Sequence, residues 1–192
     1  MIVFAGPNGA GKTTHAEHIL RALGINTFVN ADFIAKGLSG RQVETVAFEA
    51  GRIMLRRLRQ LAGDGQDFGF ESTLASRSFA PFLAGLRARG YRVSIYYFWL
   101  RSAGLAVKRV RMRVRLGGHD VPVDVIRRRF ARSVANLFDL YLALAEEWTV
   151  FDNSGPAQSR QIASHNDHQT VVQDKESWKK LLQLASPKPS AP

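Results

Sequence analysis

The stretch GPNGAGKTT, residues 6–14, decides how the rest of this chain is interpreted, and it directly follows the apolar run of residues 1–5. Its spacing, Gly6-x-x-x-x-Gly11-Lys12-Thr13, is that of a phosphate-binding loop, whose backbone N–H groups face the phosphates of a nucleoside triphosphate. Lys12 adds a mobile positive charge, and Thr13 supplies the hydroxyl that such loops place on Mg²⁺. The residues assigned to the nucleotide are Gly6, Pro7, Asn8, Gly9, Ala10, Gly11, Lys12, Thr13 and Thr14.

Outward from this loop, strand-like and helix-like segments alternate. The segment RVRMRVRL alternates as a strand would, but it leads into Gly117 and Gly118 as a helix leads into its stop, and we predict a helix. The alternation predicts an α/β fold of the P-loop, kinase-like type, a three-layer sandwich around a mainly parallel sheet. Strands are expected near residues 2–5, 25–29, 67–73, 91–100 and 149–151, and helices near 12–23, 43–61, 78–89, 106–116 and 126–144.

The C-terminal part is expected to differ from the rest. Residues 155–168 are polar and predicted to form a loop, residues 169–173 a small strand, and residues 176–184 a terminal helix. We therefore expect a P-loop kinase domain over residues 1–154, an extension that packs on it over 155–184, and a disordered tail over 185–192.

Composition excludes several classes of protein. The 192 residues suit one domain and include no cysteine, which rules out a disulfide framework and a thiolate metal site. No apolar stretch approaches the roughly 20 residues that span a bilayer, and no basic region precedes the N-terminal apolar run. We expect a soluble, cytoplasmic protein without a membrane partner.

The formal charge of +11 is concentrated in one part of the chain. Residues 101–133 contain ten lysines and arginines against two acidic residues, so an anionic ligand is expected there. Small-molecule kinases gather phosphate charge with arginines from a segment that closes over the site. At i, i+4 spacing Arg109 shares a helix face with Arg113, and Arg128 with Arg132. The alternative for most of the ten basic residues is an ordinary solvated surface.

Two carboxylates follow predicted strands. Asp32 comes after the second strand in VNADF, and Glu71 ends the third in FEST. Because the carboxyl ends of parallel strands border the ligand crevice, Asp32 can accept the proton of an acceptor hydroxyl. The alternatives are that Asp32 caps a short helix over residues 33–36, and that Glu71 lies at a solvated strand end.

Together, GPNGAGKTT, NAD, FEST, the arginine- and valine-rich helix, GGHDVP, IRRRF and DNS resemble the zeta toxin family of P-loop kinases, above all its chromosomal zeta-toxin-like branch. GGHDVP is the most specific of these segments, and the resemblance runs from residue 2 to about residue 154. It implies a toxin that uses ATP and Mg²⁺ to phosphorylate the 3′-hydroxyl of UDP-N-acetylglucosamine, and an antitoxin as protein partner.

By the same resemblance, Lys12 and Thr13 hold ATP and Mg²⁺, Asp32 is the general base, and Glu71 and Thr73 contact the acceptor. Arg109 corresponds to the first phosphate-clamping arginine. The second clamp position falls near His119, with Arg127, Arg128 and Arg129 a turn or two beyond, and which of them substitutes stays open. His119 and Arg128 are the candidates that we assign to the substrate.

We therefore expect a phosphotransferase whose catalytic residues are Asp32, Lys12 and Arg109. One rival is a nucleic-acid-binding NTPase. Segments that bind single-stranded nucleic acid usually interleave basic residues with aromatic side chains that stack on the bases. Between Arg101 and Ser133 the one Phe, Tyr or Trp is Phe130, so the sequence disfavours this rival. A second rival, an ATP-binding module without turnover, is left open.

Overall fold

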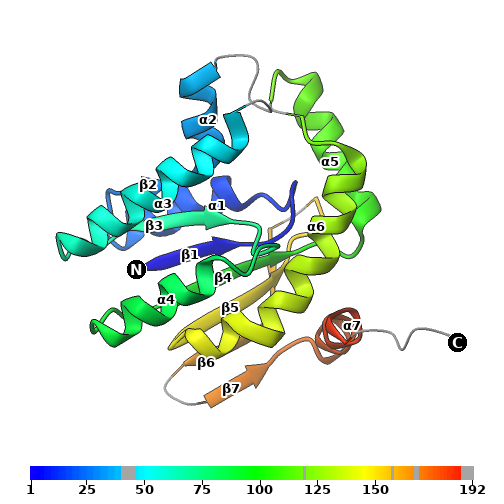
Figure 1. The fold of residues 1–192 in the computed structure, drawn as a ribbon. Helices are drawn as coiled ribbons and strands as arrows, with labels where there is room; N and C mark the ends of the chain where they lie inside the picture. The colour runs from blue at the N-terminus through cyan, green and yellow to red at the C-terminus, as the bar shows by residue number, and fades with distance from the viewer. Residues whose placement is uncertain (40–45, 119, 157, 167–168, 187–192) are drawn as a thin grey trace, which may run out of the picture.

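The computed structural model describes residues 1–39, 46–118, 120–156, 158–166 and 169–186. Strands and helices alternate along the chain, as Figure 1 shows. The strands are β1 (Ile2–Ala5), β2 (Phe28–Val29), β3 (Gly69–Ser72), β4 (Ser94–Trp99), β5 (Glu147–Asp152), β6 (Arg160–Asn166) and β7 (Gln169–Val172). The α-helices are α1 (Lys12–Ala22), α2 (Ala31–Ser39), α3 (Ala47–Gly63), α4 (Phe79–Ala88), α5 (Ala103–Arg115), α6 (Val123–Asn136) and α7 (Lys175–Ala185).

The strands form one sheet in the order β2-β3-β1-β4-β5-β6-β7. The pairs among β1 to β5 are parallel, whereas β6 and β7 are antiparallel additions at one edge. Because β1 lies between β3 and β4, the loop that leaves β1 emerges beside the end of β3. Phe4 lies opposite Glu71, and Ala5 opposite Ser72.

Helices cover both faces of this sheet, so the predicted three-layer sandwich is confirmed. On one face, buried residues of α3, α4, α6 and α7 pack with strand residues that include Val3 and Ile95. On the other face, α1, α5 and further residues of α6 pack with strand residues that include Phe4 and Phe98. Neighbouring strand residues serve different faces because successive side chains of a strand point to opposite sides of the sheet.

The arginine- and valine-rich segment is helical, as predicted. Ser102 Oγ caps α5 by accepting a hydrogen bond from the backbone N–H of Leu105 at 3.1 Å. At the other end, Gly117 has φ +82° and the N–H of Gly118 donates to the carbonyl of Arg113 at 2.9 Å. This pattern satisfies carbonyls at the end of the helix, and the left-handed turn explains the glycine.

Residues 126–144 were expected to form one helix, but α6 ends at Asn136. A π-helical turn, Leu137–Tyr141, and a 3₁₀ turn, Leu142–Leu144, follow it. The apolar positions recur at helical spacing through all three segments, so the pattern cannot mark where the hydrogen bonding changes. None of the helices in the described ranges has the length and apolar character needed to cross a bilayer.

The region after β5 departs from the polar loop expected over residues 155–168. Residues Arg160–Asn166 form β6, which pairs antiparallel with β5. Of its seven residues only Ile162 and Ala163 are buried, so the strand carries no apolar alternation and is produced by its backbone pairing. The small strand and the terminal helix predicted beyond it are confirmed as β7 and α7. Most of the expected disordered tail, residues 187–192, lies outside the described residues.

Candidate active site

The loop of residues 6–14 lies at the C-terminal end of β1 and opens α1, and three of its glycines have a positive φ. A Cβ on Gly6 would lie 2.2 Å from the carbonyl oxygen of Phe98, and one on Gly11 would lie 2.7 Å from Asn153 Nδ2. Asn153 Nδ2 in turn donates to the carbonyl of Ala10 at 2.7 Å. The loop is thus held against β4 and the segment after β5, and glycine is required by both the backbone angle and the space.

Glu71, at the end of β3, is the centre of a partly buried polar cluster. Its carboxylate accepts a hydrogen bond from Thr13 Oγ1 at 2.6 Å and from Asn30 Nδ2 at 2.9 Å. Lys12 Nζ lies 3.4 Å from the same carboxylate and donates to the carbonyl of Pro7 at 3.0 Å. Lys12 is 5% exposed, so its charge needs a partner inside the protein. The Glu71 carboxylate and the Pro7 carbonyl are those partners.

A hydroxyl and a carboxylate 2.6 Å apart at the start of the P-loop helix are a donor set that suits Mg²⁺. Such sites use one or two carboxylates and a hydroxyl, and phosphate oxygens complete the coordination. Thr13 and Glu71 therefore fit the ion that the loop motif implies. The contact of Glu71 with the acceptor stays a prediction, and the structure shows that Glu71 also contacts Thr13 and Lys12 of the P-loop.

Asp32 lies in the first turn of α2, directly after the edge strand β2. The backbone N–H of Asp32 donates to Asn30 Oδ1 at 2.7 Å, so Asn30 provides the side-chain cap of this helix. The helix begins at Ala31 and not at residue 33, so Asp32 lies within its first turn and does not cap it. The carboxylate of Asp32 is exposed and lines the cavity described next.

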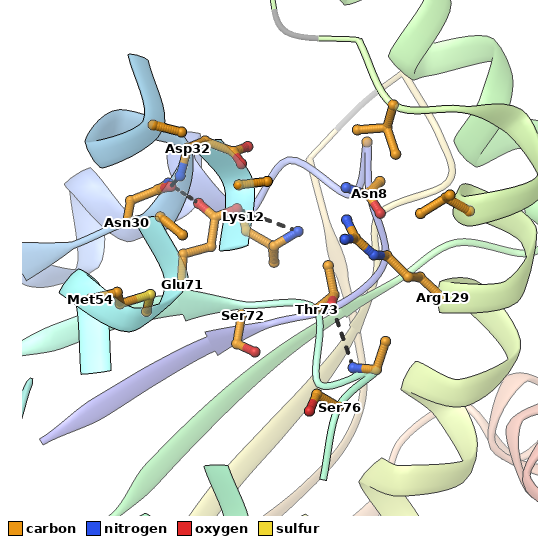
Figure 2. Close-up of a pocket in the computed structure, with 18 of the residues that line it drawn as sticks. Asn8, Lys12, Asn30, Asp32, Met54, Glu71, Ser72, Thr73, Ser76 and Arg129 are labelled. Carbon is orange, nitrogen blue, oxygen red and sulfur yellow. Dashed lines mark hydrogen bonds and ion pairs between the residues drawn. The ribbon is translucent and has the colours of Figure 1, made fainter. Parts of the chain in front are cut away.

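A cavity of about 550 Å³ joins these groups. Its walls come from the P-loop, β3 and the segment after it, α2, α3, the end of α5, and α6. In Figure 2, Asp32 and Asn30 lie on one side, Asn8 and Arg129 on the other, and Lys12 and Glu71 between them. The polar and charged residues that line the cavity are Asn8, Lys12, Asn30, Asp32, Glu71, Ser72, Thr73, Ser76, Arg113, Asp120, Arg128, Arg129 and Arg132.

The cationic wall of this cavity is formed mainly by α6. Arg128, Arg129 and Arg132 come from this helix, and Arg113 comes from the last turn of α5. Arg128 had been expected at the substrate, and Arg129 had been one of the candidates for the second phosphate clamp. Arg113 and Arg132 had been named only as the helix-face partners of Arg109 and Arg128. Arg128 also approaches Asp124 at 3.9 Å, one turn earlier on the same exposed face.

Arg109 occupies a different position from these arginines. Its guanidinium donates to the carbonyls of Ser154 at 3.3 Å and Gly155 at 3.1 Å, and it is not among the residues that line the cavity. A Cβ on Gly9 would lie 3.1 Å from Arg109 Cβ, so α5 packs directly against the P-loop at this residue. The expected phosphate clamp at Arg109 stays a prediction. His119, the other residue assigned to the substrate, lies outside the described residues.

The segment after β3, which includes Thr73, is fixed from the far side by α6 and the π-turn. Asn136 Nδ2 donates to the carbonyl of Leu74 at 2.8 Å, and the hydroxyl of Tyr141 donates to the carbonyl of Ser76. Burial raises the pKa of Tyr141 to about 12, so this hydroxyl stays a donor. Leu74 is fully buried at φ +53°, a conformation that persists only where the surroundings enforce it.

Residues 1–140 match the family described as AAA domain (AAA_33), and the chain belongs to this family. An uncharacterized protein of Haemophilus influenzae is 25% identical over 129 residues, which are 67% of this chain and 91% of that protein. The sequence comparisons thus support the P-loop assignment but name no substrate.

The fold is that of P-loop kinases, as three solved structures illustrate. A chain of the AvrRxo1-ORF1:-ORF2 complex with ATP superposes with a TM-score of 0.77 at 17% identity. The match covers the whole of this chain but 64% of that one. A chain of the PezAT toxin-antitoxin system of Streptococcus pneumoniae gives a TM-score of 0.61 at 16% identity over 96% and 82% of the two chains. A gluconokinase from Sinorhizobium meliloti gives 0.50 at 18% identity over 96% and 92%.

Proposed function

We propose that this protein is an ATP-dependent kinase that phosphorylates a hydroxyl of a small metabolite. The observation that carries the proposal is the single cavity in which Lys12 of the P-loop and the carboxylate of Asp32 both take part. A phosphotransferase needs this combination, because a positioned base must act on a hydroxyl beside the transferring phosphate. An ATP-binding module without turnover would not need the part of the cavity that lies beside Asp32.

In the proposed reaction, the acceptor oxygen attacks the γ-phosphorus of ATP while the bond from that phosphorus to the bridging oxygen breaks. ADP leaves with the electron pair of that bond, and the hydroxyl proton passes to the Asp32 carboxylate. Lys12 and the arginines of the cavity compensate the charge on the phosphate oxygens during transfer. Thr13 and Glu71 would hold Mg²⁺, which neutralises and orients the β- and γ-phosphates when bound.

A nucleotide sugar such as UDP-N-acetylglucosamine is the acceptor that we propose. The cavity contains four arginines in addition to Lys12, more cationic groups than the terminal phosphates of ATP require, and only three carboxylates line it. An acceptor with its own phosphates would use this excess. The resemblance of NAD and FEST to the zeta toxins supports the same class.

The test is to incubate the full chain with Mg-ATP and UDP-N-acetylglucosamine and to measure a gain of one phosphate by mass spectrometry. We expect a phosphorylated sugar nucleotide with the wild type and a rate of its formation lower on the order of 10²-fold with Asp32→Asn. Unmodified UDP-N-acetylglucosamine, together with phosphorylation of another compound in a metabolite extract, would reject this acceptor and retain the kinase.

Regulation by a protein antitoxin belongs to the same proposal. The AvrRxo1 structure is a two-protein complex, and PezAT is named as a toxin-antitoxin system. If this chain is likewise a toxin, its induced expression in bacteria arrests growth and that of Asp32→Asn does not. Equal growth with both proteins would refute toxicity without affecting the kinase assignment.

A further inference from the structure

Asn8 in the P-loop contains a buried hydrogen-bond acceptor that has no donor. The residue is 8% exposed, and within the described part of the chain no group donates to its Oδ1. Such an atom is unusual, because most buried polar atoms are hydrogen-bonded and an unsatisfied one destabilises the protein. The backbone does not demand asparagine either, since Leu74 is the one non-glycine residue with a positive φ among those described.

The chemistry of the atom restricts what it can bind. A side-chain carbonyl oxygen only accepts hydrogen bonds, so ionised phosphate oxygens of a nucleotide cannot satisfy it. The partner must be a donor that reaches this side of the cavity. Lys12 is already engaged by the Pro7 carbonyl and Glu71, which leaves the arginines as the cationic donors of the cavity.

Arg129 is the arginine that faces Asn8. Both residues line the same cavity, and Figure 2 shows the guanidinium of Arg129 extending from α6 into the cavity beside Asn8. A guanidinium has five N–H donors in a planar fork, so one edge can bind a phosphate while another N–H bonds to a carbonyl oxygen. The side chain of Arg129 is long and exposed, so its guanidinium can reorient.

We propose that Asn8 is a positioning residue that accepts a hydrogen bond from Arg129 and thereby aims its guanidinium at the transferring phosphate. The proposal rests on the proposed function, because it assigns a task to Arg129 during phosphate transfer. It also explains why the P-loop keeps an unsatisfied acceptor: the hydrogen bond forms when the triphosphate draws Arg129 into place. In the complex with ATP, the guanidinium is then already held in place and loses less conformational freedom on reaching the transition state.

The test is a double-mutant cycle with Asn8→Ala, Arg129→Ala and the double variant in the full chain. The readout is transfer of label from γ-labelled ATP in a metabolite extract. We expect Asn8→Ala to lower turnover on the order of 10-fold to 100-fold, the range for a hydrogen bond to a charged group. Arg129→Ala should lower it more, on the order of 10³-fold. The double variant should equal Arg129→Ala within about threefold, because Asn8 acts through Arg129.

Arg128 provides the matched control, because it lines the same cavity from the same helix but approaches Asp124. The fold-losses of turnover caused by Asn8→Ala and Arg128→Ala should multiply in their double variant. If the fold-losses of Asn8→Ala and Arg129→Ala also multiply in their double variant, Asn8 acts independently of Arg129, for example on an acceptor hydroxyl. That result would overturn the proposal. Turnover of Asn8→Ala within threefold of the wild type would overturn it as well.

A second cycle on the Kd of Mg-ATP, measured by titration calorimetry, separates this proposal from the kinase assignment. If the wild type transfers no phosphate, the proposed function fails, and coupling between Asn8 and Arg129 in ATP binding still decides the positioning role. Non-additive Kd values in this cycle support that role, and additive values reject it. Melting temperatures of all variants identify any effect that comes from unfolding.

Discussion

Replacing Glu71 with glutamine keeps the shape of the side chain and removes the charge that lies 3.4 Å from the Lys12 ammonium. At an effective dielectric constant of about 20, the Coulomb attraction of this pair is roughly 5 kcal/mol. Desolvation of both buried groups offsets much of that attraction. Lys12 also keeps the Pro7 carbonyl, and the new amide oxygen can still accept from Thr13 and Asn30.

We therefore expect Glu71→Gln to lower the free energy of unfolding by about 2 kcal/mol, less than the usual cost of breaking a fully buried pair. For a chain of this size the melting temperature falls by about 4–8 °C. Nucleotide binding should respond in the opposite direction. Without Mg²⁺, the affinity for ATP should rise by about 10-fold, because Lys12 no longer pairs with a carboxylate that also repels the phosphates.

Turnover should fall on the order of 10²-fold in the same variant, since the proposed Mg²⁺ donor set loses its carboxylate. Calorimetry in EDTA measures the affinity, and phosphate transfer with Mg²⁺ measures the activity. Glu147→Gln is the control, because it removes a charge from the surface pair with Arg92, where the expected effect is about 0–1 kcal/mol. Glu71→Gln with unchanged affinity in EDTA and undiminished turnover would refute this account of Glu71.

The remaining predictions concern the base, the loop, the segment after β3 and pH. Asp32→Asn should keep the ATP affinity and lower phosphate transfer on the order of 10²-fold, measured with the identified acceptor; transfer within a few-fold of wild type would reject the base. Gly11→Ala should lower the ATP affinity at least about 10-fold, whereas Gly24→Ala, with a similar φ but open space, should cost about 1–2 kcal/mol of stability and keep the affinity. Asn136→Ala should destabilise the fold by about 1–3 kcal/mol and raise the KM of the acceptor more than that of ATP; equal changes in both would deny it a role at the acceptor. Desolvation lowers the pKa of His15 below 6.5, so the unfolded chain binds its proton more tightly and stability should fall as the pH drops through about 6.5. Urea titrations above and below that pH should show a smaller loss for His15→Gln than for the wild type.

Much of the fold follows from local sequence patterns. The P-loop combines a buried strand, a glycine turn and an amphipathic helix within 23 residues, so its spacing alone identifies it. β4 is a largely apolar run that follows the glycine turn at Gly90. β6 could not be found in this way, because its polar sequence is ordered by pairing with β5 and by α7 rather than by its own pattern.

The site is less predictable because its contacts join distant parts of the chain. The hydrogen bond between Thr13 and Glu71 spans 58 residues and depends on β3 lying next to β1. The sequence shows that Glu71 ends a strand, but the order of strands in the sheet decides that it meets the P-loop. The cap of α2 joins residues that are close in sequence, Asn30 and Asp32. Residue type alone does not distinguish the two, because asparagine and aspartate cap helices equally well.

The arginines show the limit of helical spacing most clearly. The i, i+4 rule places Arg109 and Arg113 on one face, but Arg109 lies where α5 packs on the P-loop, and only Arg113 lines the cavity. On α6 the buried face of Ile126 and Phe130 fixes the rotation of the helix, which turns Arg129 and Arg132 as well as Arg128 toward the cavity. That rotation is set by the tertiary packing of α6 against α5 and α7.

The most direct test of the central claim is to follow the label when the full chain acts on γ-labelled ATP in a metabolite extract with Mg²⁺. Mass spectrometry identifies the labelled products, and Lys12→Ala serves as the inactive reference because it removes the cation that compensates the growing phosphate charge. The account predicts a labelled, phosphorylated organic product with the wild type and none with Lys12→Ala. Label that appears only in inorganic phosphate, or stays in ATP with both proteins, would contradict it.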